Sequence, residues 1–305
     1  MKLKKKISVV AGALLRGTLL LVAPFPALAA TPDGVVGIPR SYITEESDTL
    51  LDVAREFDIG YVEIRAANPG IDPWLPGGGK VIALPTRHVL PAGPREGIVI
   101  NLPELRLYLY RPGEAPRSFP IGIGGEGKET PIGQTKIARK GAHPVWVPTK
   151  SEHVENPDLP ESVGPGPDNP MGDFALYLAW TGYAIHGTNK PYSIGRRDSH
   201  GCIRMLPEDI DFLFRNAAIG TKVTVVDQKV KLGWLQGELY LEIHPDQAEA
   251  DELEAKGYTA YPNPVDADDQ VTKAAGAEAW RLDWYQVHLA ELRRDGLAVQ
   301  ITISQ

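Results

Sequence analysis

Apolar and polar residues alternate along the middle of the chain, which is the pattern of β-strands. The clearest case is the run Leu105 to Tyr110, where three leucines alternate with one arginine and two tyrosines. It predicts a half-buried strand that pairs with Ile98 to Asn101 in a hairpin. Further strands are predicted at Phe119 to Ile123, Gly133 to Ala138, Ala175 to Leu178, Tyr183 to Ile185 and Lys222 to Val226.

Only one segment of this region has the signals of a helix. Pro207 to Asn216 begins with a proline and carries Glu208 and Asp209 in its first turn, where acidic residues favour a helix start. The pattern therefore predicts a mainly β domain over residues 97–227, with one helix shortly after Cys202.

Residues 40–86 show helical periodicity instead. The apolar positions of a first helix share one face, namely Leu50, Val53, Ala54 and Phe57. A second short helix is expected before the turn signal Asn68-Pro69, and residues 80–85 are expected to form a closing strand. The segment Pro85 to Arg95, with three prolines and a glycine, reads as a semi-rigid linker.

The pattern of residues 228–305 predicts a mixed α/β extension that packs on the mainly β domain. Gly233 to His244 is typical of paired strands around a Gln236-Gly237 turn, and a helix is expected from Asp269 to Asp295. Trp280, Trp284 and Val287 would share one face of that helix, where core packing is favoured over contact with a glycan. Residues 297–303 then alternate as a strand.

The N-terminus has the pattern of a secretory signal peptide. Four lysines within the first six residues precede an apolar run through Leu21, and Ala27-Leu28-Ala29 matches a small-residue cleavage site. Residues 1–29 are therefore expected to be removed on export. A retained membrane anchor is the alternative, but Arg16 interrupts an already short apolar stretch.

The charge balance argues against a nucleic-acid partner. The whole chain has 32 basic and 39 acidic residues, and removing the leader with its five basic residues leaves a net charge of about −12. The mature surface is acidic, so nucleic-acid binding is not expected.

The segment Ser199-His200-Gly201-Cys202-Ile203-Arg204 carries the chemistry. Cys202 is the only cysteine and has His200 two positions before it and His186 sixteen positions upstream, which is the set of groups a thiol acyltransferase needs. A buried, inert cysteine is the structural alternative. A zinc site is a third alternative. One cysteine and two histidines at irregular spacing supply only three of the four ligands of a structural zinc site, so no metal is predicted.

The glycine-rich run Gly122 to Gly127 satisfies the dinucleotide-binding pattern G-x-G-x-x-G. Lys128-Glu129-Thr130-Pro131 follows where that fold requires a helix. The glycines are therefore expected to form a turn before the next strand, and no cofactor is predicted.

Residues 97–227 resemble the L,D-transpeptidase catalytic domain, or YkuD domain, of bacterial cell-wall enzymes. The resemblance lies in His186-Gly187-Thr188, Ile194-Gly195, the cysteine segment and Thr130-Pro131-Ile132-Gly133. It implies a β-sandwich in which Cys202 is the nucleophile, His186 the proton acceptor and donor, and Gly187 the residue whose backbone orients His186. His200 would be auxiliary, and the amides near Gly201 would stabilise the oxyanion.

The basic residues around the cysteine are candidates for binding the substrate. Arg204 suits a carboxylate of the peptide stem, and Ser199, Arg196 and Arg197 are further candidates. A structural ion pair of Arg204 with Asp198 or Glu208 is the alternative.

The resemblance also implies a reaction and a compartment. Such enzymes release the terminal D-alanine of a peptidoglycan tetrapeptide, form a thioester, and pass the acyl group to a diaminopimelate amine or to the C-terminal lysine of a lipoprotein. The expected location is the periplasm, in association with the cell wall. An L,D-carboxypeptidase, in which water is the acceptor, and a non-catalytic wall-binding protein are the alternatives.

Residues 40–86 resemble a LysM domain, a strand-helix-helix-strand module that binds glycan chains. The shared positions are Asp48-Thr49-Leu50, Ala54, Phe57, Asn68-Pro69 and Ile82-Ala83-Leu84-Pro85, whereas Ser47 replaces the usual glycine. Binding to peptidoglycan glycan strands is expected, with structural docking against the rest of the protein as the alternative.

Overall fold

The computed structural model describes residues 34–259 and 263–304. The described residues all belong to one compact unit. The predicted signal peptide, residues 1–29, lies outside them. No helix in the described part of the chain is long and apolar enough to cross a membrane.

The first elements have the predicted order of strand, helix, helix and strand. Strand β2 (Arg40–Ile43) pairs antiparallel with β3 (Val81–Leu84), and helices α1 (Leu50–Glu56) and α2 (Tyr61–Ala67) lie between them in sequence. Side chains of both helices and both strands form a small core of their own, which includes Leu50, Ile64 and Ile82. This order agrees with the expected elements, while the LysM resemblance itself stays a prediction.

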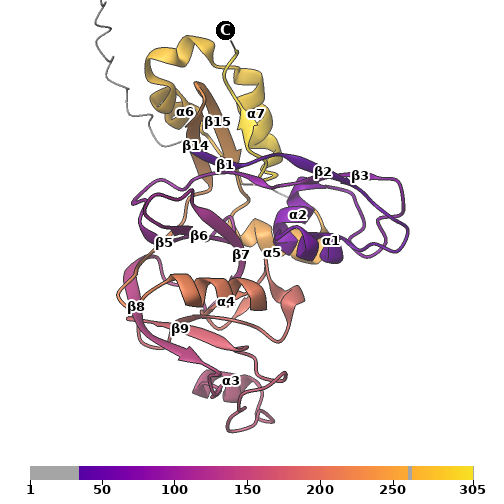
Figure 1. The fold of residues 1–305 in the computed structure, drawn as a ribbon. Helices are drawn as coiled ribbons and strands as arrows, with labels where there is room; N and C mark the ends of the chain where they lie inside the picture. Colours follow the sequence, from indigo (N-terminus) through magenta and orange to yellow (C-terminus); the bar gives the residue numbers. More distant parts are fainter. Residues whose placement is uncertain (1–33, 260–262, 305) are drawn as a thin grey trace, which may run out of the picture. The chain divides into compact units, whose positions relative to one another are not determined.

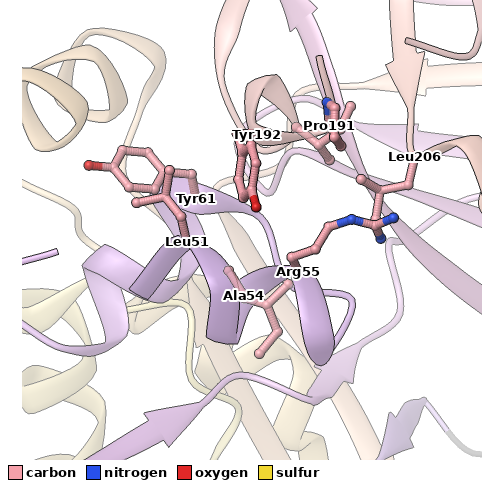
Figure 2. Close-up of a pocket in the computed structure, with 9 residues that line it drawn as sticks. Leu51, Ala54, Arg55, Tyr61, Pro191, Tyr192 and Leu206 are labelled. Atoms are coloured by element: carbon pink, nitrogen blue, oxygen red, sulfur yellow. The ribbon is translucent and has the colours of Figure 1, made fainter. Parts of the chain in front are cut away.

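Helices α1 and α2 border a small pocket whose other wall belongs to the catalytic domain. Leu51, Ala54 and Arg55 of α1 face Pro191, Tyr192 and Leu206 there (Figure 2). The N-terminal module is thus in direct contact with the residues that flank Cys202.

The predicted linker is wrong, because part of Pro85 to Arg95 is a buried strand. Strand β4 (Arg87–Val89) pairs antiparallel with β1 (Val35–Gly37), and His88, Val89 and Leu90 are all buried. Leu90 packs against Val99 and Tyr108. The segment therefore covers the outer face of the first hairpin of the catalytic domain.

The catalytic domain is a mainly β structure, as predicted. Its strands are β5 (Gly97–Asn101), β6 (Arg106–Tyr110), β7 (Arg117–Gly124), β8 (Gly133–Ala142), β9 (Phe174–Leu178), β10 (Ala184–His186), β11 (Arg197–Ser199), β12 (Ile203–Met205) and β13 (Lys222–Val226). Among the described residues they form one sheet in the order β11-β7-β12-β10-β9-β8-β13-β5-β6. Figure 1 labels β5 to β9 of this sheet. The first half of β7 also pairs with β6 and its second half with β12, so the sheet closes on itself.

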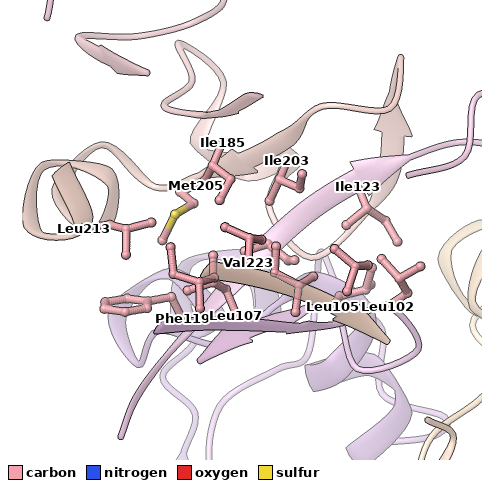
Figure 3. Close-up of a cluster of buried hydrophobic side chains, with 14 of the residues drawn as sticks. Leu102, Leu105, Leu107, Phe119, Ile123, Ile185, Ile203, Met205, Leu213 and Val223 are labelled. Carbon is pink, nitrogen blue, oxygen red and sulfur yellow. The ribbon is translucent and has the colours of Figure 1, made fainter. Parts of the chain in front are cut away.

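A single large core fills this sheet. Ile185, Ile203 and Met205 point into it from the strands that flank the cysteine (Figure 3). Helix α4 (Pro207–Asn216) follows as predicted and adds Ile210 and Leu213. A second helix, α3 (Lys150–Glu155), was not predicted, because none of its residues is buried and it therefore has no apolar face to recognise.

Strand β6 is not half-buried, because both of its faces are covered. Leu107 and Leu109 enter the large core, while Arg106 and Tyr108 are buried on the other side. The ammonium of Lys231 lies 5.6 Å from the centre of the Tyr108 ring, and Arg106 pairs with Glu63 of α2. Segments from both ends of the chain thus cover the face that alternation alone assigns to solvent.

The C-terminal extension begins with the predicted hairpin. Strands β14 (Val230–Leu235) and β15 (Glu238–Ile243) pair around Gln236 and Gly237, and β15 also pairs with β16 (Val299–Gln300). Helix α5 (Gln247–Lys256) follows, and its Ala250 and Leu253 belong to the core of the catalytic domain.

The single helix expected from Asp269 to Asp295 is wrong. The structure has α6 (Asp268–Ala275), a 3-10 turn over Gly276–Arg281 and α7 (Trp284–Arg293). Gly276 ends α6 with a φ of 54°, and the Asp283 carboxylate accepts hydrogen bonds from the first amides of α7, so a new helix begins there. Trp280 falls in the break and is 72% exposed, whereas Val287 is buried as expected.

Candidate active site

Two adjacent parallel strands bring the predicted catalytic residues together. In the register of β10 and β12, Ile185 is opposite Ile203 and His186 is opposite Arg204. Because successive side chains alternate across a strand, and both isoleucines enter the core, His186 and Arg204 share the opposite face. Cys202 directly precedes β12 and belongs to the same alternation. The period of two thus places the thiol, the imidazole and the guanidinium on one side.

The turn before Cys202 is shaped by side chains that hydrogen-bond to its backbone. Ser199 Oγ accepts from the Gly201 amide at 3.1 Å and donates to the Cys202 carbonyl at 2.6 Å. Thr130 Oγ1 donates to the Gly201 carbonyl at 2.9 Å. Gly201 has a φ of +98°, and a Cβ there would lie 2.8 Å from the Tyr183 ring, so the turn requires glycine.

These bonds revise two predicted roles. The Gly201 amide is engaged by Ser199, so this amide is not a free oxyanion donor. The Ser199 hydroxyl borders the cleft but is used within the turn, which does not support a contact with substrate. Both residues instead position Cys202.

His186 is held in one tautomer by its neighbour. Its Nδ1 lies 2.7 Å from the Gly187 carbonyl oxygen, which can only accept, so Nδ1 carries the proton and Nε2 is the basic atom. Burial, with a smaller effect of the Arg204 cation, lowers the pKa of His186 to about 4, against the opposing hydrogen bonds to the Gly187 and Met171 carbonyls. The imidazole is therefore neutral near pH 7 and able to accept a proton.

The Cys202 thiol is protonated in this state. Burial raises its pKa, and the Glu152 carboxylate adds to that effect. Its Sγ–H donates to the Gly182 carbonyl oxygen at 3.7 Å. The resting pair is thus a neutral thiol and a neutral imidazole, which suits removal of the thiol proton during attack rather than a preformed thiolate.

Cys202, His186 and Arg204 border a cleft of about 600 Å³. Four aromatic side chains that the sequence did not single out also border it, Trp146, Tyr177, Trp180 and Tyr183. The acidic residues Glu152 and Glu155 of α3 line it as well. The cleft therefore combines an aromatic surface with charges of both signs, a lining suited to a peptide that carries carboxylates and amines.

His200 connects the nucleophile turn to α3. Its Nε2 lies 2.9 Å from Glu155 Oε2 and 2.8 Å from Lys128 Nζ, and its Nδ1 lies 3.6 Å from Glu152 Oε1. These contacts tie the turn to α3 and to Lys128, while the auxiliary role of His200 stays a prediction.

The predicted arginines separate into two groups. Arg204 lines the cleft and also pairs with Asp198 at 2.8 Å, which is one of the two alternatives considered for it. Arg196 and Arg197 do not border the cleft, and they pair with Glu254 and Asp251 of α5. Their predicted contact with substrate is not supported by this position, because their guanidinium groups are already neutralised by another element.

Comparison with known proteins identifies the family. A model of the L,D-transpeptidase catalytic domain, YkuD, matches residues 95–225. The protein named "Probable L,D-transpeptidase ErfK/SrfK" of Escherichia coli K12 is 37% identical over 298 residues, which cover 93% of this chain and 94% of that protein. The chain belongs to the L,D-transpeptidase family.

Other members of the L,D-transpeptidase family match in part. "Probable L,D-transpeptidase YbiS" of E. coli K12 is 47% identical over 198 residues, which cover 63% of this chain and 64% of YbiS, so the chain spans less than two thirds of that relative. The crystal structure of L,D-transpeptidase 3 from Mycobacterium tuberculosis aligns with 48% of this chain and 67% of its own at 18% identity and a TM-score of 0.34. That overlap is too partial to inform the site.

Two groups of described residues have the spacing of metal ligands, and neither borders the cleft. One is His88, Glu104 and Glu242, whose carboxylates both contact the Lys231 ammonium at 2.7 Å. The other is Asp268, His288 and Glu291 of the C-terminal extension. The buried group already holds a cation in Lys231, so its acidic residues serve as partners of an ammonium.

Proposed function

We propose that this L,D-transpeptidase family member is exported and acts at the cell wall on the tetrapeptide stems of peptidoglycan. The observation that carries the proposal is the shared face of β10 and β12, which presents Cys202, a neutral His186 and Arg204 to one cleft. A nucleophile, a base and a carboxylate-binding cation in a cleft of this size suit acyl transfer from a peptide that ends in a free carboxylate.

Acylation follows from the protonation states. His186 Nε2 takes the thiol proton as Cys202 Sγ attacks the carbonyl carbon between diaminopimelate and the terminal D-alanine. The amide of Cys202 is the proposed donor to the oxyanion, since the Gly201 amide is engaged by Ser199. The imidazolium then protonates the departing nitrogen, so the C–N bond breaks, D-alanine leaves and a thioester remains.

Transfer to an acceptor uses the same base. An amine attacks the thioester carbon, His186 removes the amine proton, and the thiolate of Cys202 leaves and regains a proton. The proposed acceptors are a second diaminopimelate, which gives a cross-link, or the C-terminal lysine of a wall-anchored lipoprotein.

The N-terminal module is proposed to bind glycan strands. Support comes from large apolar side chains on its surface, since Ile43, Trp74, Leu75 and Val81 are all exposed. Ile43 and Val81 are opposite each other in the β2–β3 pair, so they form a continuous apolar spot. Such surfaces suit stacking on sugar rings.

Mass spectrometry of the protein with purified disaccharide-tetrapeptide tests the proposal. Donor alone should give cross-linked dimers that lack one D-alanine, and an added lysine-terminated peptide should give a peptide adduct. Cys202→Ala should give neither product. Tripeptide alone would point to water as the acceptor and a carboxypeptidase, and unchanged substrate with every acceptor would contradict the proposal.

A further inference from the structure

The segment that leads into the nucleophile turn is held by residues from outside the catalytic domain. Residues 187–196 connect β10 to β11, and β11 (Arg197–Ser199) ends at Ser199 of the turn. The Tyr61 amide donates to the Ile194 carbonyl at 3.3 Å, and the Val62 amide donates to the Gly195 carbonyl at 3.1 Å. Both donors lie in the first turn of α2, where amides have no acceptor within their own helix. The helix thus directs its free donors at this connection.

The two backbones touch at a pair of glycines. A Cβ on Gly60 would lie 2.9 Å from Gly195 Cα, and a Cβ on Gly195 would lie 2.1 Å from Tyr61 N. Gly60 has a φ of −74° and a ψ of 153°, which any residue adopts. Its own conformation therefore does not demand glycine, and the close approach to Gly195 does.

Arg196 joins this contact to the C-terminal extension. Its guanidinium lies 3.7 Å from the centre of the Tyr61 ring, and Nη1 donates to Glu254 of α5 at 2.6 Å. The neighbouring Arg197 donates to the Gln247 carbonyl at 2.7 Å and pairs with Asp251 of the same helix. Arg196 thus contacts both α2 and α5, and Arg197 contacts α5 alone.

Helix α1 holds both flanks of the site. Tyr192 donates its hydroxyl to Asp52 at 3.2 Å, and Arg55 donates through Nη2 to Glu208 of α4 at 2.9 Å. Tyr192 precedes the nucleophile and Glu208 follows it. Figure 2 shows Tyr192 and Arg55 among the residues that line the small pocket.

We infer that the N-terminal module and α5 form a clamp that positions the nucleophile turn, with Arg196 as a positioning residue. The clamp comprises Gly60, Tyr61 and Val62 of the N-terminal module and Asp251 and Glu254 of α5. Residues 187–196 are also bonded to β7, where the Gly195 amide donates to the Ile121 carbonyl and the Arg196 carbonyl accepts from the Ile123 amide, at 3.1 Å each. They lead directly to the Ser199 bonds that shape the turn, so movement at Gly195 is passed on to Cys202. The effect on rate rests on the proposed function, whereas the effect on mobility does not.

Gly60→Ala tests the clamp with one methyl group. Gly78→Ala is the matched control, since its Cβ would meet only the flexible Glu46 side chain within the same module. We expect Gly60→Ala to speed hydrogen exchange in residues 189–199 but not in β8 or β13. The rate of D-alanine release should fall by about 10-fold or more, because small displacements of a nucleophile have large effects on kcat. Gly78→Ala should match the wild type in both measurements.

The outcomes separate the two proposals. Wild-type exchange and wild-type kcat in Gly60→Ala would overturn the clamp. If the wild type itself releases no D-alanine, yet Gly60→Ala still increases exchange in residues 189–199, the clamp stands and the proposed function fails.

A charge exchange provides a second test that does not depend on the folding of Gly60→Ala. Arg196→Glu should increase exchange in residues 189–199 and lower kcat, since it faces Glu254 with a like charge. Adding Glu254→Arg should restore most of the slow exchange and most of kcat. KM for the donor should change little in either variant. A KM effect that the second substitution does not restore would instead place Arg196 in contact with substrate and overturn its positioning role.

Discussion

His186 combines deep burial with a cationic neighbour, and both keep its imidazole neutral near pH 7. Its pKa of about 4 predicts that kcat falls only as the pH falls towards 4, because the protonated imidazole cannot accept the thiol proton. Arg204→Met removes the nearby cation, so the pKa of His186 should rise and the acid limb should move to higher pH. Glu152→Gln should move it the other way, since the Glu152 carboxylate raises the pKa of His186.

The measurement is a kcat–pH profile of each variant together with NMR titration of His186. Arg215→Met, which removes an exposed arginine of α4, is the control and should leave the profile unchanged. Identical acid limbs in wild type and Arg204→Met would show that the cation does not act on His186.

Asp209 is a second buried group whose titration has a measurable consequence. Asp209 is only 2% exposed. Its burial, together with the nearby Asp58 and Glu208 carboxylates, raises the pKa of Asp209 to about 7. The folded protein therefore keeps the proton that the unfolded chain loses above about pH 4, so stability is lost as the pH rises towards and through 7.

Asp209→Asn should remove this dependence. Its free energy of unfolding should gain about 1–3 kcal/mol relative to the wild type between pH 5 and pH 8, because the wild type goes on losing stability over that interval. Urea denaturation at both pH values measures the difference, with Asp211→Asn on the exposed side of α4 as the control. A variant that loses stability relative to the wild type over that interval would show that the ionised carboxylate is favourable at this helix start.

At the scale of elements, Asn68 closes the N-terminal module. Its Nδ2 donates to the Ile64 carbonyl at 2.9 Å and to the Ala83 carbonyl at 2.8 Å, and its Oδ1 accepts from the Ala83 amide at 2.7 Å. One buried side chain thus ties the end of α2 to β3. This explains physically why Asn68-Pro69 is a useful signal in the sequence.

Asn68→Ala should destabilise the module by about 2–3 kcal/mol, because it leaves buried backbone groups without partners. Hydrogen exchange should increase in α2 and β3, and, if the clamp is correct, in residues 189–199 as well. Increased exchange confined to β3 would mean that the module does not transmit its loosening to the nucleophile turn.

At the scale of the whole molecule, a buried ionic cluster joins three parts of the chain. The Lys231 ammonium contacts Glu104 and Glu242 at 2.7 Å each and donates to the Val89 carbonyl at 2.7 Å. Nearby, Glu63 pairs with Arg106 at 2.9 Å. The N-terminal module, the catalytic sheet and the C-terminal extension therefore share one set of buried charges.

Lys231→Met should lower the free energy of unfolding by about 3–5 kcal/mol, because two buried carboxylates lose their cation. Adding Glu104→Gln and Glu242→Gln should recover part of that loss. Thermal unfolding should remain a single transition at a lower Tm, since the three parts share the cluster. Two separate transitions in the wild type would show that the parts unfold independently.

The sequence predicted the local features of the site well. Period-two alternation placed strands at β10 and around β6. The family resemblance implied that the Gly187 carbonyl orients His186, and the structure has that contact at 2.7 Å, whereas the roles of Cys202 as nucleophile and His186 as base stay predictions. Helix α4 was found from its proline and acidic first turn. Each of these signals arises among residues a few positions apart, where backbone geometry relates sequence directly to structure.

Other features could not be found in this way. Glu152 and Trp180 reach the cleft only because α3 and the loop after β9 fold over it, and neither carries a local motif. The sequence favoured Arg196 and Arg197 as substrate-binding residues because their partners on α5 are 58 and 50 positions away. The segment Pro85 to Arg95 read as a linker because its prolines do not reveal that it covers Tyr108.

The sequence by itself thus determined the family and the mainly β catalytic domain, and it predicted the roles of the Cys202 thiol and of His186, because motifs and periodicity are properties of neighbouring residues. Tertiary structure alone decided the neutral state of His186, the lining of the cleft and the contacts of the nucleophile segment with both ends of the chain. Those properties depend on burial and on charges brought together from distant positions, which no local pattern records.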